Sequence, residues 1–311
     1  MSYPKVTVVG AGQVGATAAE LLLLHSVADV VMIDVAEGLP QGKALDLMHT
    51  RSVERFGPTI TGTNDYADTA GSDIVVITAG LPRKPGMTRD DLLAANSAIV
   101  RSVMSHAVAH SPEAIFLLVT NPLDIMVYLA WKESGLPATR VLGMGGVLDS
   151  ARFAYAVAEK TGAAITSIDA LAMGAHGDAM VPMPRFTTID GTPITDSLPA
   201  ADVEELVQRT IFGGAEVVGL LKTGSAFYAP AASIVRMVRA ILGDTRDVLP
   251  SCVYLEGEYG VSDVYMSVPA SLGRSGVRGV VELELVDSEA EALRASAATI
   301  VDSLVALGLR D

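Results

Sequence analysis

Residues 5–15 read Lys-Val-Thr-Val-Val-Gly-Ala-Gly-Gln-Val-Gly. The β-branched run at 5–9 is typical of a buried strand, and the residues from Ala16 to Leu24 follow a helical pattern. Three glycines, spaced Gly-x-Gly-x-x-Gly, join the two segments. A strand, a glycine-rich turn and a helix in this order predict the first unit of a dinucleotide-binding fold.

Strand-like apolar runs continue along the first half of the chain, separated mostly by segments long enough for crossover helices. They lie at 30–33, 59–62, 74–78, 115–120 and 140–142. The run Asp-Ile-Val-Val-Ile-Thr (73–78) is continuously apolar inside, as expected for a strand buried on both faces. We therefore expect α/β architecture with a doubly wound, parallel, six-stranded sheet, a Rossmann fold, in residues 1–145.

A second domain is expected over residues 146–311, because 311 residues exceed one ordinary core. Its pattern is mixed α/β. Helices are predicted at about 149–161, 200–222, 225–242 and 287–308, and strands around 165–172, 184–189, 252–255, 263–268 and 280–285.

Composition excludes several classes of protein. The net charge of −14 would repel a phosphate backbone, so we expect no nucleic-acid partner. Charged residues interrupt every long apolar run, which argues against a membrane span, and no secretory signal precedes the first strand. With a single cysteine, Cys252, the chain is expected to be cytoplasmic. From Asp190 onward the chain has 18 acidic and 9 basic residues, an excess of negative charge that indicates a cytoplasm with a high salt concentration.

The glycine-rich turn and the acidic residue after the second strand predict a cofactor site. The first glycine allows a tight turn, the second lets the backbone approach a pyrophosphate, and the third lets helix and strand pack closely. Asp34 can accept hydrogen bonds from ribose hydroxyls and would repel the 2′-phosphate of NADP, so NAD is favoured. The turn residues of this site are Gly10, Ala11, Gly12, Gln13, Val14 and Gly15.

Three further motifs carry polar groups suited to hydride transfer on a 2-hydroxy acid. Asp149 and Arg152 stand at i,i+3 near the start of a helix and share one face. His176 lies among small residues in Gly-Ala-His-Gly-Asp, where backbone can approach a ligand. The loop at 80–89, with Arg83 and Arg89, follows the fourth strand and reads as a basic lid.

These motifs together resemble the lactate/malate dehydrogenase family, most closely its bacterial malate dehydrogenases of lactate-dehydrogenase-like build. The resemblance covers nearly the whole chain. Its stretches are GAGQVG (10–15), PQGKALDL (40–47), TGTNDY (61–66), ITAGLPRKPGMTRDDLL (77–93), TNPLDIM (120–126), GVLDSARF (146–153), GAHGDAMVP (174–182) and LKTGSAFYAP (221–230).

The resemblance implies the catalytic roles. His176 would exchange a proton with the substrate oxygen, and Asp149 would orient the imidazole and stabilise its charged form. Arg152 would hold the C1 carboxylate through two parallel hydrogen bonds, and Arg89 would polarise the reacting carbonyl as the lid closes.

The resemblance also implies how the cofactor and the substrate are positioned. Asn121 would orient the substrate beside the nicotinamide, and the Asn121–Pro122 peptide bond is expected to be cis. Asn96 and Val119 would line the cofactor. We expect no metal site in addition to these residues.

Arg83 is expected to decide the substrate. Lactate dehydrogenases carry glutamine at the matching position, whereas an arginine can pair with the distal carboxylate of malate or oxaloacetate. A lactate or other 2-hydroxy-acid dehydrogenase remains an alternative, as does an NAD-binding protein that has lost the reaction. The resemblance favours a homotetramer over a dimer.

Overall fold

The computed structural model describes residues 3–81 and 89–310. The chain divides into two compact units. Unit 1 comprises Met1–Met144, Phe227–Asp247 and Leu272–Arg278, and unit 2 comprises Gly145–Ala226, Val248–Ser271 and Gly279–Asp311. The sequence predicts one domain for everything after residue 145, whereas two later segments group with unit 1. The division of the chain into domains at residues 1–145 and 146–311 therefore stays a prediction.

The sheet of unit 1 is built from six parallel strands in the order β3-β2-β1-β4-β5-β6. Nearly every residue of β1, β2, β4, β5 and β6 is buried, as their continuous apolar sequences require. The predicted doubly wound sheet is therefore confirmed. The strands are β1 (Lys5–Val9), β2 (Asp29–Ile33), β3 (Ile60–Thr63), β4 (Ile74–Ile77), β5 (Ile115–Leu118) and β6 (Val141–Gly143).

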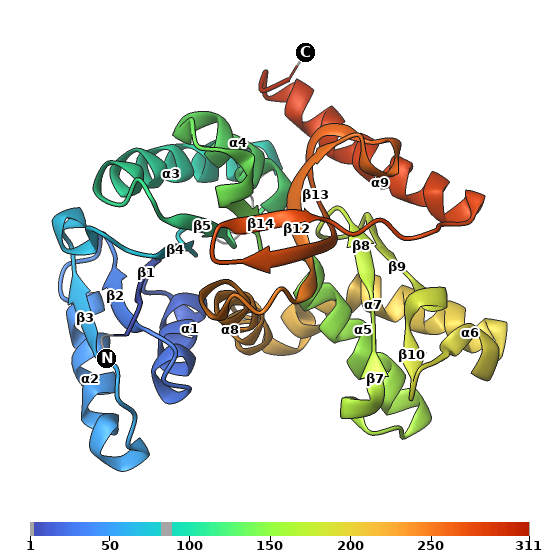
Figure 1. The fold of residues 1–311 in the computed structure, drawn as a ribbon, viewed down its shortest axis with the longest axis horizontal. Helices are drawn as coiled ribbons and strands as arrows, with labels where there is room; N and C mark the ends of the chain where they lie inside the picture. Colours follow the sequence, from blue (N-terminus) through green and yellow to red (C-terminus); the bar gives the residue numbers. More distant parts are fainter. Residues whose placement is uncertain (1–2, 82–88, 311) are drawn as a thin grey trace. The chain divides into compact units, whose positions relative to one another are not determined.

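Helices cover both faces of this sheet (Figure 1). On one face α1 (Gln13–Leu24) packs against α8 (Tyr228–Gly243), and on the other α3 (Arg89–His110) packs against α4 (Leu123–Ser134). The contact between α1 and α8 is the reason why a segment so late in the chain belongs to unit 1. The remaining helical segments are α2 (Leu39–Glu54) and the 3-10 turns Tyr66–Thr69 and Ala138–Arg140.

One stretch of α3 has the properties of a membrane span. Within the described residues, only Asp91–His110 is long and apolar enough to cross a bilayer, by length and composition alone. Val100 and Met104 of this stretch are completely buried inside unit 1, and the helix packs against α4. We therefore interpret α3 as a helix of the domain core.

Unit 2 combines helices with antiparallel strands. Strands β12 (Val248–Glu256), β13 (Ser262–Gly273), β8 (Ala172–Gly174) and β9 (Met180–Pro182) pair antiparallel in this order. Strands β7 (Ile168–Asp169), β10 (Thr188–Ile189) and β11 (Thr192–Pro193) form a separate three-stranded sheet. The helices are α5 (Gly146–Thr161), α6 (Ile194–Ser197), α7 (Ala200–Leu221) and α9 (Asp287–Ala306), with 3-10 turns at Ile165–Ser167, Pro184–Phe186 and Glu258–Gly260.

The core of unit 2 forms where α5 meets α7. Phe153 and Val157 of α5 are fully buried together with Ile194 and Leu206. This packing fixes the helix that carries Asp149 and Arg152. The predicted mixed α/β architecture is confirmed.

The prediction of a strand around residues 280–285 is wrong. Strand β14 runs over Gly276–Val280, pairs with β13, and ends where the strand was predicted to begin. The alternation of Glu282, Leu283 and Glu284 imitates a strand, but the amide of Leu283 donates its hydrogen bond to the hydroxyl of Tyr259 instead of to a neighbouring strand. At Leu283, a side-chain oxygen therefore takes the place of the carbonyl acceptor that a neighbouring strand would supply.

Candidate active site

The glycine-rich turn lies in unit 1, between β1 and α1. A Cβ atom at Gly15 would lie 1.9 Å from the carbonyl oxygen of Gly10, and one at Gly10 would lie 2.8 Å from the amide nitrogen of Ala79. Gly10 also has a φ of +105°. Packing of the chain itself thus requires glycine at both positions.

Gly12 differs from the other two glycines. Its φ is an ordinary −69°, and a Cβ there would meet no atom within 4 Å. Gly12 is the N-cap of α1 and offers no side-chain cap, and the first turn carries no acidic residue. The first amides of the helix have no acceptor within it, so this open space suits the pyrophosphate of a dinucleotide.

Asp34 follows β2 and lies beside the turn. Its Oδ2 accepts a hydrogen bond from the amide of Ala11 at 2.7 Å, and its Oδ1 accepts one from the amide of Ala36 at 3.0 Å. Two backbone amides therefore fix the carboxylate, and each oxygen retains acceptor capacity for a ribose hydroxyl. Burial and the negative charge of Asp34 raise the pKa of nearby Tyr66 to about 12.

Asn96 holds two backbone segments at the carboxyl ends of β4 and β5. Its Oδ1 accepts from the amide of Leu81 at 2.8 Å, and its Nδ2 donates to the carbonyl oxygens of Asn121 at 2.7 Å and Leu81 at 3.3 Å. Both protons of the buried amide group are thus used within the chain. Asn96 acts by positioning its neighbours.

Asn121 and Val119 stand at the end of β5. The Asn121–Pro122 peptide bond is cis, as expected. Asn121 is exposed and Val119 is half-buried, with its amide bound to the carbonyl oxygen of Ile77 at 2.9 Å. The structure therefore gathers the turn, Asp34, Asn96, Val119 and Asn121 in one unit.

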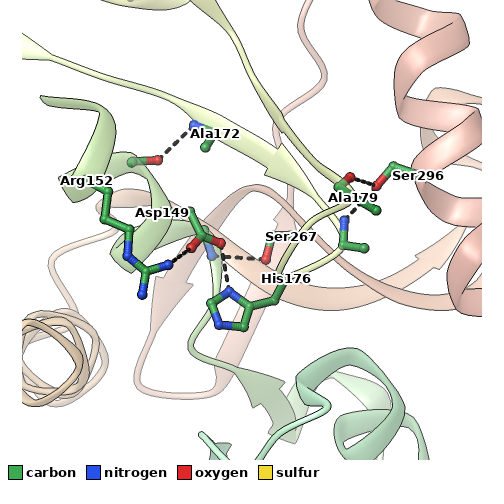
Figure 2. A network of polar contacts seen from close by, with 10 residues as sticks. Asp149, Arg152, Ala172, His176, Ala179, Ser267 and Ser296 are labelled. Carbon is green, nitrogen blue, oxygen red and sulfur yellow. Dashed lines mark hydrogen bonds and ion pairs between the residues drawn. The ribbon is translucent and has the colours of Figure 1, made fainter. Parts of the chain in front are cut away.

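The second cluster lies in unit 2 and centres on Asp149, in the first turn of α5 (Figure 2). Its Oδ1 pairs with Nη1 of Arg152 at 2.9 Å, and its Oδ2 accepts a hydrogen bond from Nδ1 of His176 at 2.8 Å. The side chains of Asp149, Arg152 and His176 are 3%, 20% and 13% exposed. One buried carboxylate thus joins the two other groups.

This arrangement defines what each group can do. Because Nδ1 of His176 is bound to the carboxylate, the imidazole is held in one orientation and proton exchange falls to Nε2. Arg152 uses one nitrogen for Asp149 and lies along Gly213 and Gly214 of α7, where a Cβ would come within 3.4–3.5 Å of the guanidinium group or its stem. Those distances are ordinary van der Waals contacts, so α7 packs against the arginine, whose remaining donors suit a carboxylate.

Three buried serines around this cluster are not among the residues that the sequence predicts for the site. Ser150 Oγ accepts from the amide of Ala172, Ser267 Oγ from that of Gly146, and Ser296 Oγ from that of Ala175 (Figure 2). Ser267 and Ser296 are each 121 positions from their partners, and no local pattern marks them. They fix the backbone on which the polar side chains stand.

Two predicted site residues cannot be placed. Arg83 lies outside the described residues. Arg89 begins α3, but its side chain also lies outside them. In the described part of the chain, no three His, Cys, Asp or Glu side chains gather in a way that could hold a metal ion.

The sheet of unit 1 and the carboxylate–histidine–arginine cluster of unit 2 define a class of protein. The chain is an NAD-dependent oxidoreductase. The family models for lactate/malate dehydrogenases match almost all of it, the NAD binding domain over residues 4–143 and the alpha/beta C-terminal domain over residues 146–306. The chain belongs to the lactate/malate dehydrogenase family.

Individual relatives support this assignment. A protein from Trichormus variabilis named malate dehydrogenase is 53% identical over 96% of this chain and 92% of its own. The crystal structure of Cryptosporidium parvum malate dehydrogenase superposes with a TM-score of 0.95 at 43% identity, over 98% of this chain and 99% of its own. A lactate dehydrogenase of the same organism, complexed with lactic acid and NAD, gives a TM-score of 0.94 at 39% identity over 97% of each chain. The fold is therefore common to both activities.

Proposed function

We propose that the chain catalyses the reversible, NAD-dependent oxidation of (S)-malate to oxaloacetate. The observation that carries this proposal is the buried carboxylate of Asp149, which holds a proton carrier, His176, and a carboxylate-binding group, Arg152. A 2-hydroxy acid requires both groups, one for its hydroxyl and one for its carboxylate. The name of the 53% identical relative supports malate as the substrate.

In malate oxidation, His176 would accept the hydroxyl proton at Nε2, and Asp149 would stabilise the resulting imidazolium. Arg152 would bind the C1 carboxylate with guanidinium protons not used by Asp149. Bound NAD supplies the hydride acceptor. In the reverse direction, His176 would return the proton to the carbonyl oxygen of oxaloacetate.

The cofactor would be held by residues of unit 1. The turn would receive the pyrophosphate at Gly12, where the space beside the backbone is open, and Asp34 would accept the ribose hydroxyls. Asn121 would orient the substrate as well as the cofactor. The full set proposed to contact or position NAD is Gly10, Ala11, Gly12, Gln13, Val14, Gly15, Asp34, Asn96, Val119 and Asn121.

Two further substrate-binding residues, Arg83 and Arg89, are proposed from the sequence alone. Arg89 would polarise the reacting carbonyl, and Arg83 would pair with the distal carboxylate that malate has and lactate lacks. Lactate is the second candidate substrate, because the lactate dehydrogenase with bound lactic acid is similar over almost the whole chain. The positive charge of Arg83 favours malate over lactate, because only malate carries a distal carboxylate.

NADH absorbance after mixing with oxaloacetate tests the reaction. The protein should oxidise NADH, and His176→Asn should reduce the rate by at least about a hundred-fold, since general acid–base catalysis contributes 10²–10⁴. His49→Asn, at an exposed position of α2, is the matched control and should retain the full rate. Absence of NADH oxidation by the unaltered protein would favour an NAD-binding protein without catalysis.

We also propose that the chain forms a homotetramer. Large apolar side chains remain exposed on α2, among them Leu45 and Val53, and on α7, among them Phe212 and Leu220. Association of further copies would remove such side chains from water. Light scattering should give a mass four times that of the 32.3 kDa chain, and a mass of two chains would contradict the proposal.

A cytoplasmic location is proposed as well, where the protein would serve the malate step of the tricarboxylic acid cycle. It is supported by the lone Cys252, which is buried, and by the similarity to dehydrogenases. Fractionation of cells should recover the activity in the cytosolic fraction, and recovery with membranes would contradict this location.

A further inference from the structure

The loop that carries His176 is hydrogen-bonded by a residue more than a hundred positions later in the sequence. Ser296 lies in the middle of α9, and its hydroxyl is buried. Oγ accepts a hydrogen bond from the amide of Ala175 at 2.8 Å and donates one to the carbonyl oxygen of Ala179 at 2.5 Å (Figure 2). One hydroxyl thus binds the backbone on both sides of His176.

This use of a helical serine differs from that of Ser303 and Ser233. Ser303 of the same helix donates to the carbonyl oxygen of Thr299, and Ser233 of α8 donates to that of Ala229, four positions back in each case. Such bonds to the preceding turn are the ordinary choice for serine inside a helix. Ser296 instead directs its hydroxyl away from its own helix and into the loop.

The loop is shaped to receive this hydroxyl. A Cβ atom on Gly174 would lie 2.6 Å from Oγ of Ser296, and Gly174 has a φ of +87°. Within the loop, the amide of Met180 bonds to the carbonyl oxygen of Gly177 at 3.0 Å, and Gly177 has a φ of +122°. Ser296 therefore restrains the backbone on both sides of His176, in addition to the bond from His176 to Asp149.

We infer that Ser296 is a positioning residue, which sets the His176 imidazole at the Asp149 carboxylate by clamping both sides of the loop. The inference rests on the proposed function in that His176 is taken as the acid/base group. Loss of the hydroxyl would leave the amide of Ala175 and the carbonyl oxygen of Ala179 unpaired and let the imidazole move away from Oδ2 of Asp149. Small misplacements of catalytic groups lower turnover strongly.

Ser296→Ala tests the inference, with Ser296→Thr as the variant that keeps the hydroxyl. Steady-state kinetics with NADH and oxaloacetate should show kcat lowered between about ten-fold and a hundred-fold in Ser296→Ala, with the KM for NADH unchanged. Ser296→Thr should recover most of kcat. The pH dependence of kcat should shift in Ser296→Ala, because the carboxylate stabilises the imidazolium less.

Ser111→Ala provides a matched control in unit 1. The buried Ser111 hydroxyl also accepts from an amide, that of Ser72 at 3.1 Å, and donates to a carbonyl oxygen, that of Thr69 at 2.8 Å. The two alanine variants should therefore lose similar thermal stability, measured as Tm. Only Ser296→Ala should lose kcat, and equal kinetic losses in both variants would overturn the inference.

A readout without turnover separates this inference from the proposed function. Proton NMR of the histidine bound to Asp149 should show a low-field Nδ1–H resonance in the unaltered protein and in Ser111→Ala, and a weakened or exchange-broadened one in Ser296→Ala. An unchanged resonance in Ser296→Ala would overturn the positioning role, whether or not the protein oxidises malate. A changed resonance in a protein that does not turn over would keep the role and reject the proposed function alone.

Discussion

At the scale of single residues, Asp149 joins the two side chains of unit 2 that we propose act on the substrate, His176 and Arg152. It is almost completely buried, and it pairs with Arg152 through one oxygen and with His176 through the other. A buried carboxylate with two such partners is not an isolated charge, because each oxygen has its own donor. We therefore expect any change to Asp149 to affect the proposed proton transfer by His176 and the proposed carboxylate binding by Arg152 together.

We expect Asp149→Asn to lower kcat by about a hundred-fold or more, since it removes the charge that stabilises protonated His176. The KM for oxaloacetate should rise as well, because Arg152 loses its counter-charge. Glu159→Gln, an exposed position of the same helix, should change neither constant. Equal losses in both variants would show that α5 is merely destabilised.

The spacing of Asp149 and Arg152 predicted that they share a helix face, and the structure confirms that they pair. The choice of His176 among five histidines rested on its small neighbours, and the structure brings it to Asp149. Ser296 could not be predicted in this way. Its partners are backbone groups more than a hundred positions away, and backbone groups leave no mark in a sequence.

At the scale of elements, two glycines at the start of α1 are required for different reasons, Gly15 for packing of the chain and Gly12 for the proposed approach of the pyrophosphate. Gly15→Ala would place a Cβ 1.9 Å from the carbonyl oxygen of Gly10, so it should lower both Tm and NADH affinity, with a stability cost of about 1–3 kcal/mol or more. Gly12→Ala has open space and should leave Tm nearly unchanged, yet weaken NADH binding by about ten-fold or more. Calorimetry of unfolding and fluorescence titration with NADH would measure the two effects. Unchanged NADH affinity in Gly12→Ala would contradict the proposed pyrophosphate position.

The start of α9 makes a prediction about acid stability. Arg185 donates to both carboxylate oxygens of Glu289, at 3.1 and 2.9 Å, and thereby holds the pKa of that carboxyl below its ordinary 4.5. A lowered pKa in the folded state means that the pair stabilises the protein above pH 4.5 and loses its contribution as the pH falls through the folded-state value.

Glu289→Gln should therefore lower Tm at pH 7, and the difference from the unaltered protein should shrink as the pH falls below about 4.5. Thermal unfolding followed by circular dichroism at several pH values measures this. Glu291→Gln, exposed on the same helix, is the control and should shift Tm little at either pH. A Glu289→Gln deficit that persists undiminished at low pH would refute the assignment.

The elements of unit 1 could be predicted well, because strands buried on both faces leave continuous apolar runs in the sequence. The short strands of unit 2 could not. The run 165–172 contains a 3-10 turn and parts of two strands, β7 and β8, and the expected strand at 280–285 is replaced by irregular chain. Segments of two or three residues are too short for a periodic pattern.

At the scale of the whole molecule, the acidic composition makes a prediction about salt. The chain has 36 acidic and 22 basic residues, so like charges repel across its surface in dilute buffer. Molar KCl shortens the screening length to about 3 Å and should raise Tm if the acidic surface is an adaptation to salt. A flat Tm between low salt and molar KCl would reject that idea.

The overall fold does not decide between substrates, since a malate and a lactate dehydrogenase superpose almost equally well on this chain. We propose that the choice between malate and lactate depends on Arg83, a residue identified from the sequence alone. A distal carboxylate has no counterpart in lactate, so the difference between the substrates comes down to one charged group.

The most direct test of the account is the ratio of kcat/KM for oxaloacetate to that for pyruvate, measured with NADH and with NADPH. We predict a strong preference for oxaloacetate and for NADH, and a shift on the order of a thousand-fold toward pyruvate in Arg83→Gln. A preference for pyruvate in the unaltered protein would contradict the assignment of malate as its substrate, and a ratio that Arg83→Gln leaves unchanged would contradict the role proposed for Arg83.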